Sequence, residues 1–561
     1  MLEIRSKQIL GALTLLAIIT VTLVVAPYTL LDPTGIPKLT ALSFLATVAL
    51  SLMLPALKSL MRSSYKMLTI LTSLFIFQII LVMFFSGASI TAQFLGTYQR
   101  QTGALTYISL GVLMLGSSLV SDNVFVKRFI HVTLAVGIIL IAYGNLQYLG
   151  HEPFPYVSLY TVNAPIGTFG NPDFQSAFMG MIAVVAFTMA FNNAFKKSIN
   201  IGLVLTGIAS LLVVYQTLAK QGYLNFIAGL GAVILLWLFM SQRKALGFMV
   251  AGLGAVGGAL IFLGLINSGP LASFLYKGSL AARGFYWRAA VKMLTDNPIF
   301  GVGMDGFGNW YLRSRPSDTA ANGLFSNTAH NVYLDIASSG GFILIAIYLA
   351  LLVLVIISIV KFVRCSTGFD VYFAALVGAW VAYQTQAFVS INQIGLAIWG
   401  WILSGLIIGY EINGRIKNIS QAIPVKGKHQ IKKVKIAAQP LSSTLVITMF
   451  AGIIIGALIA GPIYFSNSRF FAAMKANDFA GVESAAYLHP QDQRRLFMLA
   501  GIYRNAKMDD KAVEVLKQST MTYPDSYDMW ALWLTIPSAA PSDIVYAKAQ
   551  LKRLDPFNPD L

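Results

Sequence analysis

Long apolar runs separated by short polar loops are the dominant pattern along the chain. About thirteen of these runs reach the roughly 20 residues that a helix needs to cross the hydrocarbon core of a bilayer. They lie near residues 8–26, 39–57, 67–85, 104–120, 129–149, 174–192, 199–217, 222–240, 246–266, 341–361, 371–389, 394–412 and 443–464. The pattern predicts an all-α polytopic membrane protein with about thirteen transmembrane helices.

The first run has the basic flank of a signal peptide but no clear cleavage site after it. Arg5 and Lys7 precede it, and Ala26-Pro27 is a poor sequence for cleavage. We therefore expect this run to be retained as the first membrane helix.

Basic residues gather in alternate loops between the apolar runs. The positive-inside rule assigns such loops to the cytoplasm, so the N-terminus is predicted inside and, with an odd number of helices, the C-terminus outside. The expected location is the cytoplasmic (inner) membrane, crossed many times. The basic residues of these loops are Arg5 and Lys7; Lys58, Arg62 and Lys66; Lys127 and Arg128; Lys196 and Lys197; Arg243 and Lys244; Lys361 and Arg364; and those in the run from Arg415 to Lys435.

Composition agrees with the membrane class. The chain is 57% hydrophobic and 11% charged, whereas soluble domains have about 25% charged residues. A net charge of +18 usually suggests nucleic-acid binding, but these basic residues lie in short loops and indicate topology. We therefore expect no nucleic-acid partner. The single cysteine, Cys365, excludes a disulfide within the chain.

Two predicted outer regions are long enough to carry a function: the loop 267–340 and the tail 465–561. We divide the chain into a transmembrane domain, residues 1–464, with a basic cytoplasmic loop at 411–442, and a helical-repeat domain in the tail. The tail is either a cap packed on the outer loop or a docking surface for an acceptor or partner. Its positions that match the tetratricopeptide pattern are Leu496, Leu499, Ala500, Tyr503, Ala512, Leu516 and Pro524.

The predicted spans contain almost no ionisable residue, whereas the outer segments carry several basic ones. Transporters and pumps usually place charges at mid-membrane, so this distribution favours chemistry at the outer surface. Ordinary solvation is the favoured explanation for Arg313 and Arg315, while Lys220 lies in a very short loop near the membrane surface. The other outer basic residues before the tail are Lys38, Arg100, Lys277, Arg283, Arg288 and Lys292.

The loop 267–340 combines arginines, turn signals and a histidine. Asn297-Pro298 is predicted to end a helix, and Gly301 and Gly303 allow a tight turn with close backbone approach. His330 begins the helix that re-enters the membrane. A histidine at this place can take a proton from a hydroxyl at neutral pH.

This loop resembles the signature loop of the O-antigen ligase and polymerase superfamily of lipid-linked glycan transferases. The resemblance is carried by the run from Arg283 to Phe307, followed by His330-Asn331-Val332-Tyr333-Leu334. One departure is Ala219-Lys220, where many members have Ser-Arg, because lysine keeps the charge but lacks the planar fork of arginine. Supporting segments, which extend the likeness over about residues 27–410, are Pro37-Lys38, Gly96 to Gly103, Gly167 to Pro172 and Ser390 to Gln393.

The resemblance implies transfer of a glycan from a polyprenyl-diphosphate donor to an acceptor hydroxyl on the outer face of the membrane. It implies that His330 is the general base of an inverting reaction, and that Arg283 and Lys220 meet the charge of the leaving diphosphate. The outer carboxylates before the tail form no Asp-x-Asp pair, so we expect a metal-independent enzyme without a cofactor. The residues expected to bind substrate are Arg100, Arg288, Asn331, Tyr333 and Lys38.

Three acceptors are compatible with this interpretation. A lipid-A core sugar would make the protein a ligase, the growing glycan a polymerase, and a protein hydroxyl a protein O-oligosaccharyltransferase. A lipid-glycan transporter is a weaker alternative because the spans lack charges. A non-catalytic scaffold would leave the arginine and histidine loop without a purpose.

Overall fold

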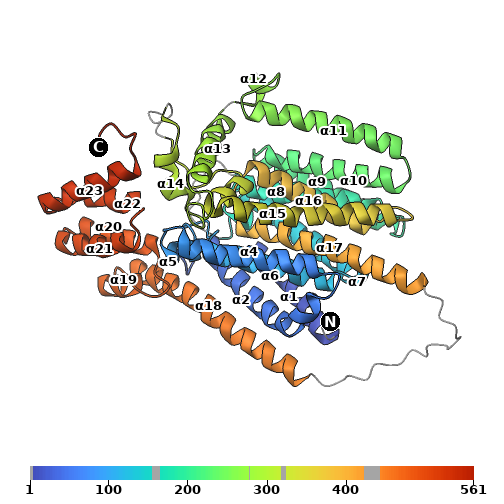
Figure 1. Cartoon of the computed structure of the whole chain (residues 1–561), viewed down its shortest axis with the longest axis horizontal. Coiled ribbons are helices and arrows are strands. Elements are labelled where there is room, and N and C mark those ends of the chain that lie inside the picture. The colour runs from blue at the N-terminus through green and yellow to red at the C-terminus, as the bar shows by residue number, and fades with distance from the viewer. Residues whose placement is uncertain (1–3, 155–163, 277, 318–323, 423–441) are drawn as a thin grey trace.

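The computed structural model describes residues 4–154, 164–276, 278–317, 324–422 and 442–561, and its regular elements in these ranges are all helices. Eleven of the described helices are long and apolar enough to cross a membrane, which confirms the prediction of an all-α polytopic membrane protein. Each predicted span overlaps one helix of the bundle in Figure 1. These helices are α1 (Ile4–Leu23), α2 (Gly35–Met53), α4 (Lys66–Phe85), α6 (Ala104–Val120), α7 (Asn123–Tyr148), α8 (Pro172–Ala190), α9 (Lys197–Gln216), α10 (Gln221–Met240), α11 (Lys244–Leu265), α15 (Val332–Cys365), α16 (Val371–Val389), α17 (Ile394–Ala422) and α18 (Ser443–Lys475).

Helix α17 is central to the bundle, and α11 lies at its edge. The most apolar stretch of α17 is fully buried, whereas that of α11 is almost fully exposed. Gly405 and Gly409 bring α17 close to α6, because a Cβ at either position would overlap the carbonyl of Met114 or Ser118. Small residues four apart are a common means of close helix contact in membranes. The exposed apolar side chains of α11 suit contact with lipid.

Segments predicted to share one side of the membrane lie at the same end of the bundle. The Lys127 ammonium lies 5.2 Å from the centre of the Tyr372 ring, and the Asn413 side chain donates to the Ser121 carbonyl at 3.2 Å. All four residues lie in or beside predicted cytoplasmic loops. The loops are therefore grouped as predicted, and the assignment of that end to the cytoplasm stays a prediction.

The opposite end, called the loop end below, carries the short helices and the tail (Figure 1). Two short helices are exceptions: η1 (Leu54–Ala56) and α3 (Leu57–Leu60) extend α2 at the other end of the bundle. The helices of the loop end are α5 (Ile90–Leu95), η2 (Gly167–Phe169), α12 (Ala272–Leu275), α13 (Ser279–Asp296) and α14 (Phe307–Ser314).

The tail folds into a C-terminal helical unit with its own core. Helix α18 leads into this core, where Phe470 is buried. The turn between α20 and α21 is short, so these two helices form a hairpin. The apolar positions Leu496 and Leu516 are buried in this core, and the tetratricopeptide assignment stays a prediction. The helices of the unit are α19 (Phe479–Ala486), α20 (Gln493–Asn505), α21 (Asp509–Thr522), α22 (Tyr527–Trp533) and α23 (Pro541–Leu554).

Candidate active site

Backbone hydrogen bonds fix the segment between α13 and α14 to a kink in α15. The Val302 N–H donates to the Ser338 carbonyl at 2.9 Å, and the Phe342 N–H donates to the Pro298 carbonyl at 2.8 Å. The kink lies at Gly341, which has φ +75° and ψ −176° inside the helix. A Cβ at Gly341 would overlap the backbone of this segment, so glycine is required for the contact.

The predicted turn residues of this segment are confirmed. Helix α13 ends directly before Asn297-Pro298. Gly301 and Gly303 have φ +61° and +94°, a region that favours glycine. A Cβ at Gly301 would overlap the backbone of Ser338 and Ser339, which accounts for the close approach to α15.

His330 lies immediately before α15 and is held through one ring nitrogen. Its φ of +52° is unusual for a residue other than glycine. Nδ1 lies 3.2 Å from Oγ1 of Thr328 and 3.4 Å from Oγ of Ser326, and the ring packs on Tyr286 with centroids 5.3 Å apart. Over the described ranges, Nε2 has no hydrogen-bond partner. Nε2 is therefore the nitrogen that a substrate hydroxyl could approach.

The environment keeps the His330 imidazole neutral at physiological pH. Burial lowers its pKa to about 4, and the positive charges of Arg100 and Arg283 contribute to this shift. These electrostatic interactions show that two arginines from separate loops act on one histidine. A neutral imidazole can accept a proton, as a general base must.

Arg283 is linked through Asp173 to the loop that carries Lys220. Burial lowers the pKa of the Arg283 guanidinium, and the negative charge of Asp173 at the start of α8 opposes that shift. The side chain of Gln221 donates to the Asp173 carbonyl, and Lys220 directly precedes it with an exposed side chain. Asp173 therefore interacts both with Arg283 and with Gln221, the residue that follows Lys220.

The loop that carries Arg100 is tied to Asp305. The Thr97 N–H donates to the Asp305 carboxylate at 2.6 Å, and the Thr97 hydroxyl donates to the Asp305 carbonyl at 3.1 Å. Burial raises the pKa of Asp305 to about 6, while the Thr97 N–H and the charge of Arg100 lower it. The first outer loop and the loop after α13 thus form one structure.

Asp305 and Asp335 belong to the site, although the sequence analysis did not single them out. Both line a small cavity together with Thr328. Asp335 accepts a hydrogen bond from the Ala329 N–H at 2.7 Å, which fixes the turn before His330. The signals in the sequence were that Asp305 follows the Gly-x-Gly turn and that Asp335 lies in the first turn of α15.

Asn331 and Tyr333, predicted to bind substrate, use their polar groups within the fold. Asn331 caps the N-terminus of α15, and its Nδ2 donates to the Phe388 carbonyl at 2.9 Å. The Tyr333 hydroxyl donates to Gln384 at 2.7 Å. Both side chains orient the helix that follows His330.

Lys38 and Arg288, also predicted to bind substrate, make their described contacts with other parts of the fold. Lys38 is fully buried, and its Nζ donates to three backbone carbonyls between residues 21 and 24 at 2.9 to 3.1 Å. These bonds satisfy carbonyls at the end of α1. Arg288 is exposed, with its guanidinium 5.2 Å from the centre of the Phe285 ring. Five residues along α13, it points roughly 140° away from Arg283.

Arg313 and Arg315 are not solvated loop charges, so the interpretation favoured from the sequence was wrong. Arg315 forms an ion pair with Asp555 at 2.8 Å, and each side chain is 6% exposed. Arg313 pairs with Asp525 at 2.8 Å. The partners lie 240 and 212 residues away along the chain, so no local pattern could indicate them. Both pairs join α14 to the C-terminal helical unit.

The part of the chain that the structure describes contains no group of three or more His, Cys, Asp or Glu residues that could hold a metal ion. The arrangement offers a neutral histidine and two arginines that act on it electrostatically. Such a set of groups can move a proton beside a negatively charged group.

Fold and site together define a multi-pass membrane protein with a candidate catalytic centre at the loop end. A family model described as O-antigen ligase matches residues 205–349. The match runs from α9 into α15, so it includes Lys220, Arg283 and His330. It supports the resemblance seen in the loop and a role like that of a membrane glycan ligase. A search of curated proteins found no match.

Proposed function

We propose that this protein transfers a glycan from a polyprenyl-diphosphate donor to an acceptor hydroxyl at the outer membrane surface, as an O-antigen ligase-like enzyme. The observation that carries this proposal is the neutral His330 under the electrostatic influence of Arg100 and Arg283. His330 and Arg283 lie in the region that the O-antigen ligase model matches, and Arg100 acts on His330 from the loop before α6. A base and fixed cations at one place suit transfer from a diphosphate leaving group.

In the proposed reaction, the acceptor oxygen attacks the anomeric carbon of the donor sugar. The new glycosidic bond forms as the bond from that carbon to the diphosphate oxygen breaks, with inversion. The hydroxyl proton passes to Nε2 of His330, and the lipid diphosphate leaves with the electron pair. Arg283 and Lys220 stabilise the negative charge that develops on the leaving group. Arg100 contributes to stabilising this charge.

Donor binding also prepares the base. In the free protein, Arg100 and Arg283 help to hold the pKa of His330 at about 4, which makes the imidazole a weak base. A bound diphosphate adds negative charge beside the same arginines and raises the pKa of the histidine. His330 therefore becomes a competent base when the donor is in place.

The test uses the full-length protein in lipid nanodiscs with a polyprenyl-diphosphate-linked glycan and candidate acceptors. Arg283→Ala and His330→Ala should each lower kcat by about 100-fold or more, since one removes charge stabilisation and the other the base. Lys292→Ala, an exposed cation on the same helix, and His151→Ala, an exposed histidine, are matched controls that should keep full activity. Wild-type transfer by both site variants would contradict the assignment.

The same assay tests the proposed metal independence and the acceptor. Transfer should persist in the presence of a chelator; its loss, followed by recovery with a divalent ion, would show that the mechanism is wrong. The acceptor that gains sugar distinguishes a ligase, a polymerase and a protein O-oligosaccharyltransferase. Protease protection of the C-terminal unit in oriented membranes tests its proposed position outside an inner membrane.

A further inference from the structure

A cleft of about 340 Å³ lies between the C-terminal helical unit and the membrane domain at the loop end. One wall comes from α5 and the loop after it, and a second comes from the segments around α14. The third wall comes from the C-terminal helical unit, through the start of α20 and residues 523–528. The cleft thus exists only because the tail is docked on the membrane domain.

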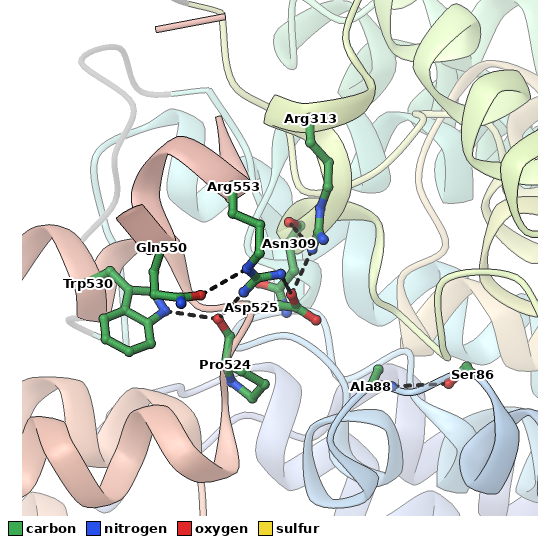
Figure 2. Close-up of polar contacts among 9 residues, drawn as sticks. All are labelled: Ser86, Ala88, Asn309, Arg313, Pro524, Asp525, Trp530, Gln550 and Arg553. Atoms are coloured by element: carbon green, nitrogen blue, oxygen red, sulfur yellow. Dashed lines mark hydrogen bonds and ion pairs between the residues drawn. The ribbon is translucent and has the colours of Figure 1, made fainter. Parts of the chain in front are cut away.

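Ion pairs hold the walls of this cleft together (Figure 2). Asp525 pairs with Arg313 of α14 at 2.8 Å and with Arg553 of α23 at 3.0 Å. Arg553 also donates to the Pro524 carbonyl at 2.9 Å. The segment 524–525 is therefore fixed to both domains, and the cleft is already formed without a ligand.

Aromatic rings line the cleft from both domains. Tyr98 and Phe325 belong to the membrane domain, and Phe497 and Tyr523 belong to the C-terminal helical unit. The guanidinium of Arg494 lies 5.4 Å from the centre of the Tyr98 ring and 5.3 Å from that of Phe497. Ring faces with polar groups at their edges can bind the apolar face and the hydroxyls of a sugar.

The polar lining is rich in amides and carboxylates. Gln99, Asn309 and Asn327 supply amide groups that both donate and accept hydrogen bonds. Among the described lining residues, four are aspartates and one is an arginine. This balance is unfavourable for a diphosphate, which the cationic side at Arg283 and Lys220 would attract instead. It suits an uncharged, hydroxyl-rich ligand.

Tyr523 gives an independent indication of a ligand. Its side chain is 3% exposed and lines the cleft, yet among the described residues its hydroxyl has no hydrogen-bond partner. A buried hydroxyl without a partner costs free energy, and most such groups in proteins are satisfied. Burial raises the pKa of the Tyr523 phenol, so the group stays protonated and is a hydrogen-bond donor without a described partner at the wall of the cleft.

The cleft borders the candidate active site. Asp305 lines the cleft and also lines the small cavity that Thr328 lines. Oγ1 of Thr328 lies 3.2 Å from Nδ1 of His330. The cleft and the surroundings of the proposed base therefore share a wall at Asp305.

We propose that this cleft binds the sugar chain of the acceptor, an uncharged glycan, and presents its terminal hydroxyl to His330. This inference rests on the proposed function and extends it by naming the acceptor class and its site. The donor diphosphate and the acceptor then reach the reacting carbon from opposite sides, as inversion requires. The C-terminal helical unit becomes half of the acceptor site.

Binding is measured with the full-length His330→Ala protein in nanodiscs, which separates binding from turnover. The oligosaccharide probes are the two candidate acceptor glycans, a lipid-A core oligosaccharide and the oligosaccharide released from the donor lipid. The other probes are a lysine-rich peptide with serine and threonine, and inorganic diphosphate. Tyr523→Phe keeps the ring and removes the hydroxyl, and it should weaken oligosaccharide binding by about fivefold to tenfold. Tyr503→Phe is the matched control, because it removes another buried tyrosine hydroxyl of the C-terminal helical unit that lies outside the cleft; it should have no effect.

Each outcome decides the proposal. Oligosaccharide binding that is weakened by Tyr523→Phe alone, with equal thermal stability of the two tyrosine variants, supports it. No oligosaccharide binding, or equal binding by both variants, overturns it. Preferential peptide binding that is lost in Asp528→Asn would show that the cleft binds a basic peptide instead. If wild-type protein transfers glycan while the cleft binds no sugar, this inference fails and the proposed function stands. If sugar binds but wild-type protein transfers none, the proposed function fails, and with it the role of the cleft as an acceptor site, which leaves only a glycan-binding cleft.

Discussion

His330 has to meet two opposing requirements. It must be neutral before the reaction, and Arg100 and Arg283 help to ensure this by holding its pKa at about 4. It must also be basic enough to take a proton, which the same charges disfavour. Burial is the larger cause of the low pKa, and the arginines add to it. In the proposed mechanism the donor diphosphate offsets the part that comes from the two arginines and so raises the pKa. The base is then strong only when the leaving group is in place, which limits the activation of water in the absence of donor.

A pH prediction follows from the lowered pKa of His330. In the free protein the imidazole stays neutral well below pH 6.5, so kcat/KM should show no histidine limb between about pH 5 and 8. With donor bound, the pKa rises, and the acid limb of kcat should lie at higher pH than that of kcat/KM. Removing one positive charge in Arg283→Gln should move the acid limb of kcat/KM upward. Profiles of the transfer rate against pH measure all three effects.

The control for this prediction concerns Asp305, whose pKa is raised to about 6. Titration of this carboxyl could produce a separate acid limb in the pH profile, so the measurement is repeated in an Asp305→Asn background. A kcat/KM that still halves near pH 6.5 in that background would mean that His330 has an ordinary pKa in the free protein. The electrostatic part of the mechanism would then be wrong.

At the scale of elements, the kink in α15 decides whether the loop after α13 reaches the site. Gly341 has φ +75°, and a Cβ there would overlap the backbone of Ile299. Gly341→Ala should therefore destabilise the protein by about 1–3 kcal/mol and lower kcat by loosening the segment that carries Asp305. Gly254→Ala in α11 is the matched control, since a Cβ there meets nothing within 4 Å. It should be neutral or stabilising by up to about 1 kcal/mol.

Thermal unfolding in nanodiscs and the transfer rate measure both variants. Equal stability and activity of Gly341→Ala and the wild type would show that the backbone at the kink tolerates an L side chain. The contact between the loop and α15 would then not position the site.

The helices of the membrane domain could be predicted from the sequence because each must be apolar over its own length. For α15 the apolar run covers only part of the helix: the predicted span begins at residue 341, whereas the helix begins at Val332, next to His330, where the loop motif placed its start. Its first nine residues include Asp335 and two serines, so they do not form an apolar run. The loop arginines and His330 were found through their motif. Asp305 was missed because its partner Thr97 lies 208 residues away, and local patterns do not encode such contacts.

At the scale of the molecule, the two domains share one working end. The membrane domain carries the proposed base and the proposed cations, and the proposed acceptor cleft needs a wall from the C-terminal helical unit. Helix α18 connects the two domains along the chain, and the pairs from Arg313 and Arg315 fix their relative position. Docking of the tail is therefore part of the proposed acceptor site, in addition to its role in stability.

The buried pair between Arg315 and Asp555 provides the test of this coupling. Removing one partner leaves a buried charge without compensation, so Arg315→Ala or Asp555→Ala should each destabilise the docked state by about 3–5 kcal/mol. The double variant should lose less than the sum of the two, because both charges are gone. The exposed pair Lys511–Glu483, 3.6 Å apart within the C-terminal unit, is the control and should contribute about 0–1 kcal/mol.

Hydrogen exchange at α14 and α23 measures docking, and steady-state kinetics measure its consequence. The single variants should expose both helices to exchange and raise the KM for the acceptor, while the KM for the donor stays near the wild-type value because the donor cations lie in the membrane domain. Exposure of the helices with an unchanged acceptor KM would show that the docked tail stabilises the protein without forming an acceptor site. A parallel rise in both KM values would instead mean that undocking disturbs the loop between α13 and α15, and with it the cations themselves.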